Sequence, residues 1–209
     1  MLWAAVGLLL AFVLWTLTVC FADVKEIGPS GSAVGLAGLN GFVHGLTGVH
    51  MDLYLITDWM GLIPVGFSAG FGLLGLIQWI RRKRLRRVDP DLLILGGFYL
   101  VVMVAYLFFE TVAVNYRPVL IQGVLEASYP SSTTLLVLCV MPAAMEQLQR
   151  RIGDPLIGGA VLCILGAFTV FMVLARLISG VHWFTDIIGG GLLGGGLVCL
   201  YVFFRRSIK

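Results

Sequence analysis

Charged residues are scarce in this sequence: Asp, Glu, Lys and Arg together make up 12% of the 209 residues, against about 25% in a typical soluble domain. Cysteines are few, and all four lie in or beside apolar runs without paired spacing, which indicates neither a disulfide framework nor a metal site. Hydrophobic residues make up 59% of the chain, and the mean hydropathy is +1.00. This composition excludes a soluble globular domain and predicts an all-α polytopic membrane protein, with residues 1–209 forming a single membrane-embedded domain.

Six apolar segments are candidates for transmembrane helices, which need roughly 20 residues each. The fourth is the shortest and contains Pro142, which we expect to kink it. The first could instead be a signal peptide, because Cys20 and Ala22 are small residues near a possible cleavage point. It lacks a basic start, which favours a retained helix. The six segments are Leu2–Phe21, Leu62–Ile80, Leu92–Phe109, Ser131–Met145, Pro155–Ala175 and Ile187–Phe204.

The basic residues predict how the six-span bundle is oriented. Eleven of the 14 fall on one side, which the positive-inside rule makes cytoplasmic together with both termini. The Arg81–Arg87 run is therefore interpreted as a topology anchor and not as a nucleic-acid site. The three exceptions are Lys25, Arg117 and Arg176. The eleven residues are Arg81, Arg82, Lys83, Arg84, Arg86, Arg87, Arg150, Arg151, Arg205, Arg206 and Lys209.

The segment Asp23–Asp58 is then extracytoplasmic. Leu36, Leu39, Val43 and Leu46 follow helical spacing, which predicts an amphipathic helix on the outer membrane surface. His44 and His50 lie here without partner spacing, so we interpret them as structural or solvated. The last span is rich in glycine, at Gly189–Gly191 and Gly194–Gly196, and small residues four apart favour close packing of this helix into the bundle.

Three polar clusters are expected at the outer ends of the spans. Arg117 follows the third span, and Ser131-Ser132 opens the fourth as a helix cap whose free N–H groups suit an anion. The third cluster is Arg176, His182 and Asp186. Two arginines suit phosphate oxygens. Because His182 and Asp186 are four residues apart, we expect them to share a helix face, with the carboxylate orienting the imidazole for attack.

These residues resemble the motifs of the type 2 phosphatidic acid phosphatase (PAP2) family, which is related in fold to the vanadium haloperoxidases. The family motifs are Lys, six residues, Arg-Pro; then Pro-Ser-Gly-His; then Ser-Arg, five residues, His, three residues, Asp. Arg117-Pro118 matches the end of the first motif and Pro130-Ser131 the start of the second. Arg176, His182 and Asp186 match the third with the same spacing.

The resemblance implies a role for each residue. His182 would be a nucleophile that forms a phosphohistidine, and Asp186 would orient it. Arg117, Arg176 and the Ser131–Ser132 turn would hold the phosphate, without a metal or other cofactor. The substrates of the family's membrane branch are lipid phosphates and diphosphates, including undecaprenyl diphosphate, phosphatidylglycerol phosphate and phosphatidic acid. The resemblance also implies a role in the bacterial cell envelope.

Three positions depart from the family motifs. Glu110 stands at the lysine position, Thr133 at the histidine of the second motif, and Ala175 at the leading serine of the third. In the family, that histidine protonates the leaving group, and a threonine does not readily do so at neutral pH. Two interpretations stay open: an extracytoplasmic lipid phosphatase that favours a diphosphate, or an impaired family member that binds a lipid phosphate. A transporter has little support, because no inverted repeat is visible.

Overall fold

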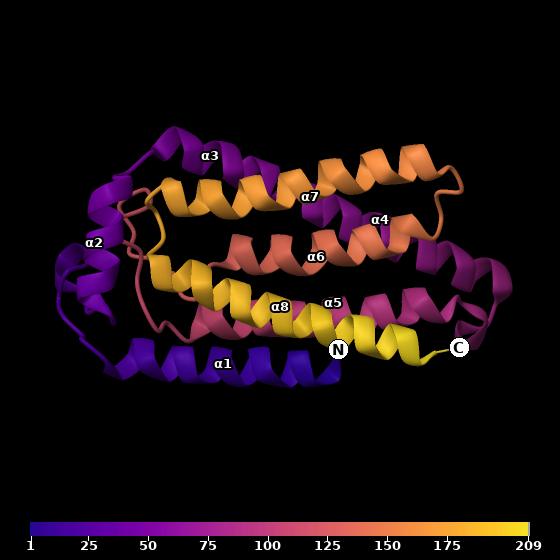
Figure 1. Ribbon diagram of the computed structural model, residues 1–209, viewed down its shortest axis with the longest axis horizontal. Helices are drawn as coiled ribbons and strands as arrows, with labels where there is room; N and C mark the ends of the chain where they lie inside the picture. Colours follow the sequence, from indigo (N-terminus) through magenta and orange to yellow (C-terminus); the bar gives the residue numbers. More distant parts are fainter. Residues whose placement is uncertain (209) are drawn as a thin grey trace.

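The computed structural model describes residues 1–208, and Lys209 lies outside the described part. Those residues form eight α-helices and two short 3-10 helices, with isolated β-bridges in the connections. Most of the helices run along the long axis of a single elongated bundle (Figure 1). The α-helices are α1 Leu2–Phe21, α2 Ala37–Thr47, α3 Met51–Met60, α4 Leu62–Arg82, α5 Pro90–Thr111, α6 Ser132–Gln149, α7 Pro155–Ile178 and α8 Phe184–Ser207.

The core lies around α6 and α8, which pack against each other. Leu135 and Cys139 of α6 meet Leu193 and Leu197 of α8 in one buried cluster, to which α1 and α5 add Phe12 and other apolar side chains. The outward faces of α1, α4, α5 and α7 instead expose large apolar side chains. A bilayer covers such faces. The molecule is therefore an all-α polytopic membrane protein.

Five helical segments are long and apolar enough to cross a membrane, within the described residues. They correspond to five of the six predicted spans. The predicted Ser131–Met145 span corresponds to α6, which is not one of the five. Much of α6 is buried by its neighbours, including the polar Thr134 and Gln147. A helix enclosed by other helices does not need an apolar surface for lipid, so the count of six stays a prediction.

The helices extend beyond several predicted spans, because polar residues cap them. Asp154 precedes α7 and accepts the backbone N–H groups of Leu156 and Ile157. Asp89 precedes α5 without a side-chain cap bond, and Pro90 occupies the first turn of this helix. α6 runs through Pro142 as one continuous helix. The predicted spans were therefore right in place but generally too short at their polar ends.

The segment between α1 and α4 differs from the prediction in one respect. A helix does form at Ala37–Thr47, over the predicted amphipathic stretch. However, α3 already begins at Met51 and leads directly into α4, so Met51–Arg82 is one candidate span of 32 residues. The spacing rule missed α3 because Asp52 and Asp58 interrupt its apolar pattern.

The two ends of the bundle have different chemistry. One end carries Arg81–Arg87, Arg150–Arg151 and Arg205–Arg206, and we call it the basic end. There Arg82 pairs with Asp89 at 2.9 Å and Arg150 with Asp91 at 2.8 Å. Figure 1 shows that the α4–α5 and α6–α7 connections and the C-terminus lie at this end, while α2 and the α7–α8 turn lie at the other.

Candidate active site

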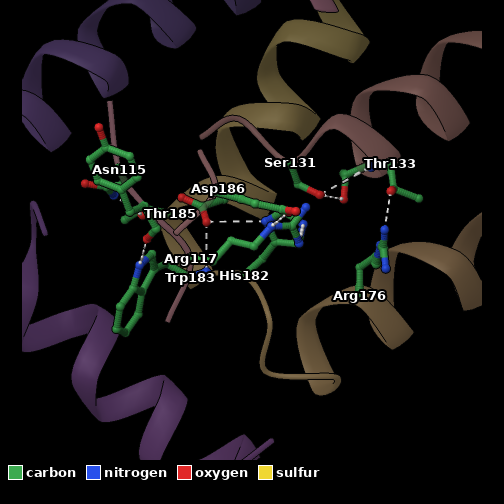
Figure 2. A network of polar contacts seen from close by, with 12 residues as sticks. Asn115, Arg117, Ser131, Thr133, Arg176, His182, Trp183, Thr185 and Asp186 are labelled. Atoms are coloured by element: carbon green, nitrogen blue, oxygen red, sulfur yellow. Dashed lines mark hydrogen bonds and ion pairs between the residues drawn. The ribbon is translucent and has the colours of Figure 1, made fainter. Parts of the chain in front are cut away.

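Three segments far apart in the sequence meet at the end of the bundle opposite the basic end. They are the loop that follows α5, the start of α6, and the turn between α7 and α8. Figure 2 shows His182 grouped with Asp186 and Arg117, and Arg176 directed toward Thr133. Arg117, Arg176, His182 and Asp186 are all less than a tenth exposed. The fold thus brings the predicted charged residues together in a buried site.

His182 has a different neighbour on each ring nitrogen. Its Nε2 lies 3.2 Å from Arg117 Nη1. Its Nδ1 lies 3.5 Å from Asp186 Oδ2. An arginine nitrogen can only donate a hydrogen bond, so Nε2 must accept, and the ring proton must lie on Nδ1, facing Asp186. This tautomer leaves the lone pair of Nε2 directed at the arginine.

The surroundings of His182 keep the imidazole neutral. Burial lowers the pKa of His182 well below its ordinary value of 6.5, and the charges of Arg117 and Arg176 lower the pKa further. A protonated ring would have no lone pair, so it could not act as a nucleophile. The lowered pKa therefore favours the neutral ring at neutral pH, which is the form that a nucleophilic role would require.

Asp186 is fixed by the first turn of α8. Its Oδ2 accepts the backbone N–H of Trp183 at 2.9 Å. Its carbonyl oxygen accepts the backbone N–H of Ser131 at 3.0 Å, which ties the start of α6 to α8. The expected shared helix face is wrong in one detail, because α8 begins at Phe184 and His182 lies in the turn before it. The turn still brings the two side chains together.

Arg117 is held by the loop between α5 and α6. The loop folds back on itself, with Arg117 donating its backbone N–H to the carbonyl of Glu126 at 3.0 Å. The side chains of these two residues also pair, with 3.0 Å between Arg117 Nε and Glu126 Oε2. Arg117 is therefore positioned beside His182, but its charge is already partly compensated.

Arg176 points away from His182 toward the start of α6 (Figure 2). Its Nη2 lies 2.5 Å from Thr133 Oγ1 and 3.1 Å from Asp58 Oδ1. Its Nη1 donates to Thr57 Oγ1 at 3.2 Å and to the Tyr54 carbonyl at 3.4 Å. Each of the two arginines thus has a carboxylate partner in the chain itself.

An open cleft of about 570 Å³ lies over this site. Both arginines line it, as do Ser132 and Thr133 from the first turn of α6. His182 is not among the residues that line it, and its side chain is only 1% exposed. Three carboxylates also face the cleft, those of Asp58, Glu110 and Glu126. The cleft therefore combines two cations with three anions.

The residues of the second motif divide between two positions. Ser131 caps α6, and its buried hydroxyl oxygen accepts from Thr134 N at 3.4 Å and from Thr134 Oγ1 at 3.0 Å. Its side chain therefore serves the helix, while Ser132 and Thr133 face the cleft. The backbone N–H groups of a first helical turn have no partner within the helix, which suits them to an anion.

The remaining departures from the motifs are also placed by the fold. Ala175 is buried within α7 and offers no hydroxyl. Glu110 is exposed at the edge of the cleft and has no ion pair among the described residues. Those residues also contain no group of three His, Cys, Asp or Glu side chains placed to hold a metal ion.

Sequence reasoning missed the partners of the arginines. Tyr54, Thr57 and Asp58 come from α3, which was not predicted, and Glu126 from a loop without a motif. A further buried network was also missed. In it Asn40 Nδ2 donates to Thr185 Oγ1 at 2.9 Å, and Thr185 N donates to Asn40 Oδ1 at 3.1 Å. The only sequence signal was that a buried arginine needs a carboxylate or polar partner.

Comparison with known proteins gives a match in structure but not in sequence. No protein-family model and no curated protein matches the sequence. Among solved structures, the chain matches the first transmembrane PAP2-type phosphatidylglycerolphosphate phosphatase from Bacillus subtilis, with a TM-score of 0.57 and 22% identity, over 99% of this chain and 98% of that one. The chain has a PAP2-type fold. The PAP2-type fold expected from the motifs is thereby confirmed over almost the full length.

Proposed function

We propose that the protein is an integral-membrane lipid phosphatase that hydrolyses a lipid diphosphate, with a prenyl diphosphate such as undecaprenyl diphosphate as the best candidate. The observation that carries the proposal is the arrangement of Arg117, His182 and Asp186. A neutral imidazole has its proton toward a buried carboxylate and its lone pair toward a guanidinium. A phosphoryl group that takes over the Arg117 Nη1 donor now facing Nε2 would free the lone pair of Nε2 and lie next to this attacking nitrogen.

The reaction would proceed in two steps. His182 Nε2 attacks the terminal phosphorus, and the bond from this phosphorus to the bridging oxygen breaks. The lipid monophosphate leaves with the electron pair of that bond. Asp186 stabilises the positive charge that develops on the ring. Water then attacks the phosphohistidine, inorganic phosphate is released, and the neutral imidazole is restored.

The surroundings of the cleft support a lipid as the substrate. An apolar groove of about 280 Å³ adjoins the polar cleft, and Tyr106, Ser132 and Leu136 line both. Its other lining residues come from α4, α5 and α6, which include Val65, Val102 and Val140. A molecule with a phosphate at one end and a hydrocarbon chain at the other fits these two adjoining surfaces.

The diphosphate is preferred over a monoester because the usual leaving-group acid is missing. General acid catalysis contributes about 10²–10⁴ in rate. An alkoxide leaves poorly, since the pKa of its alcohol resembles that of water at about 15.7. A phosphate leaves readily, because its second pKa is about 6. With Thr133 in place of the histidine, the rate of hydrolysis should therefore fall least for diphosphates.

A second candidate function is the binding of a lipid phosphate without hydrolysis. It is favoured by the pairing of Arg117 with Glu126 and of Arg176 with Asp58, at 3.0 and 3.1 Å. A phosphate must compete with both carboxylates for the charge and the N–H donors of the arginines. A protein that binds but does not turn over its ligand could tolerate this competition.

The His182→Ala variant distinguishes the two functions. If His182 is the nucleophile, phosphate release from undecaprenyl diphosphate by purified protein should fall to the background rate. Rapid quenching of the wild type, followed by mass spectrometry, should reveal a phosphorylated peptide that contains His182. The His50→Ala variant is the control, because His50 is exposed and bonds only to the Thr47 carbonyl through its ring.

Unchanged phosphate release by His182→Ala would rule out the proposed mechanism. If the wild type released no phosphate from undecaprenyl diphosphate or from phosphatidic acid yet bound them, the second function would be supported instead.

A further inference from the structure

The guanidinium of Arg176 is enclosed mainly by α3, a helix outside the three motifs. Arg176 is 2% exposed. Thr57 is fully buried, and its Oγ1 donates to the carbonyls of Leu53 or Tyr54 at 2.9 Å, so a lone pair remains to accept from Arg176. The Tyr54 carbonyl and the Asp58 carboxylate accept two further bonds. About one turn of α3 thus forms a polar surface for one arginine, buried at Tyr54 and Thr57 and exposed at Asp58.

The ring of Tyr54 contacts both arginines. The Cζ atom of Arg176 lies 4.9 Å from the ring centroid, and that of Arg117 lies 5.8 Å from it. Two guanidinium groups that approach one site repel each other. The negative face of an aromatic ring attracts a cation, and this attraction grows when water is excluded. Tyr54 is itself buried at 9% exposure, so it can hold the two cations near each other.

The position of α3 is fixed relative to the turn that carries His182. The backbone N–H of His50, at the start of α3, donates to the Ser179 carbonyl at 2.9 Å. Gly180 has a φ of +68°, and an added Cβ would lie 1.8 Å from the Gly48 carbonyl oxygen. Only glycine permits this close backbone contact. α3 lies beside α7 (Figure 1), so Tyr54 is held in register with Arg176.

From these contacts we infer that Tyr54 is a positioning residue, whose ring sets the spacing of Arg117 and Arg176 so that both can bind one phosphoryl group. The inference rests on the proposed phosphate site, but it does not require turnover. Tyr54 would act on binding, while His182 and Asp186 would carry the chemistry. Its loss should therefore weaken phosphate binding without removing the nucleophile.

The test measures the affinity for inorganic phosphate by calorimetry, and kcat and KM for undecaprenyl diphosphate. Tyr54→Leu should weaken phosphate binding about tenfold or more, since a desolvated cation–π contact has an effect of that size. KM should rise by a similar factor, with kcat changed much less. Tyr54→Phe keeps the ring and should restore both values. Trp59→Leu is the matched control, because Trp59 is an exposed aromatic residue of α3.

A series of fluorinated phenylalanines at position 54 covers the case in which Tyr54→Leu fails to fold. Fluorine withdraws charge from the ring face with little change in size, so phosphate affinity should fall stepwise with each added fluorine. Equal affinity across the series, or in a folded Tyr54→Leu protein, would overturn the inference even if the enzyme were active. Conversely, a stepwise loss of phosphate binding in a protein without turnover would support the positioning role of Tyr54 and refute the proposed hydrolysis.

Discussion

At the scale of single residues, the candidate site keeps the histidine and aspartate of the third motif and departs from the motifs at Glu110, Thr133 and Ala175. His182 keeps a carboxylate at 3.5 Å on one nitrogen and an arginine at 3.2 Å on the other. Thr133, at the position of the motif histidine, instead contacts Arg176 at 2.5 Å. The hydroxyl of Thr133 thus contacts the arginine that we propose to bind phosphate, but it does not supply a proton readily at neutral pH.

This difference predicts the substrate preference of the wild type and how to change it. Purified protein should release phosphate faster from undecaprenyl diphosphate than from phosphatidic acid, by up to about 10²–10⁴. Thr133→His should raise the rate with phosphatidic acid more than the rate with the diphosphate. Thr133→Gln, whose side chain does not ionise, is the control for the altered size.

Release of phosphate from both lipids at the same rate would contradict the leaving-group argument. So would an equal gain for both lipids in Thr133→His, because an added acid should help the poorer leaving group more.

At the scale of the helices, the glycines of α8 allow this helix to pack closely against the start of α6. Gly189 lies against the buried ring of Tyr129, and an added Cβ would come within 2.7–2.9 Å of its atoms. A Cβ added at Gly190 would lie 3.1 Å from side-chain atoms of Thr134 in α6 and 3.2 Å from the carbonyl oxygen of Ser131, which caps α6. The close packing predicted for these glycines is therefore present on the face of α8 that meets α6. It brings Ser131 near Asp186.

Gly189→Ala should destabilise the protein more than Gly191→Ala. At position 189 the added methyl group must displace Tyr129, and overpacking of this kind costs about 1–3 kcal/mol. At position 191 no atom lies within 4 Å of the added Cβ, so the change should be nearly neutral or slightly stabilising. Thermal unfolding in detergent measures both. Equal transition temperatures for the two variants would show that the contact with Tyr129 does not constrain α8.

At the scale of the whole molecule, the bundle separates its basic residues from its candidate site. Nearly all exposed arginines lie at the basic end, together with the α4–α5 and α6–α7 connections (Figure 1). Arg117 and Arg176 lie at the opposite end, and each has a partner there. We propose that the basic end faces the cytoplasm of a bacterial cell, with both termini, and that the site faces outward.

Labelling of single cysteines checks this orientation in intact cells. In a background with the four natural cysteines replaced by serine, Val124→Cys should react with a membrane-impermeant maleimide, because Val124 is exposed in the loop beside the site. Arg86→Cys, at the basic end, should react only after the cells are permeabilised. The opposite pattern would place the site on the cytoplasmic side.

Much of the fold followed from local properties of the sequence. α1 was predicted to the residue, and four other spans were located correctly, because the length of an apolar run reflects the thickness of the bilayer. The segment Met51–Met60 was missed because Asp52, Thr57 and Asp58 interrupt the apolar spacing that marks a helix, and Thr57 and Asp58 face the site. α6 was found by its serine cap, and its role as a sixth span stays a prediction.

The sequence by itself determined the class of protein, most of the helices, and the four ionisable residues Arg117, Arg176, His182 and Asp186. Composition, the length of apolar runs and the spacing within each short motif carry this information, and none of them depends on which segments meet in space. Only the tertiary structure decided which side chains pair with the two arginines of the site. Arg176 and Asp58 are 118 residues apart, and only the packing of α3 against α7 brings them together. An ion pair, unlike an apolar run, leaves no periodic pattern in the sequence.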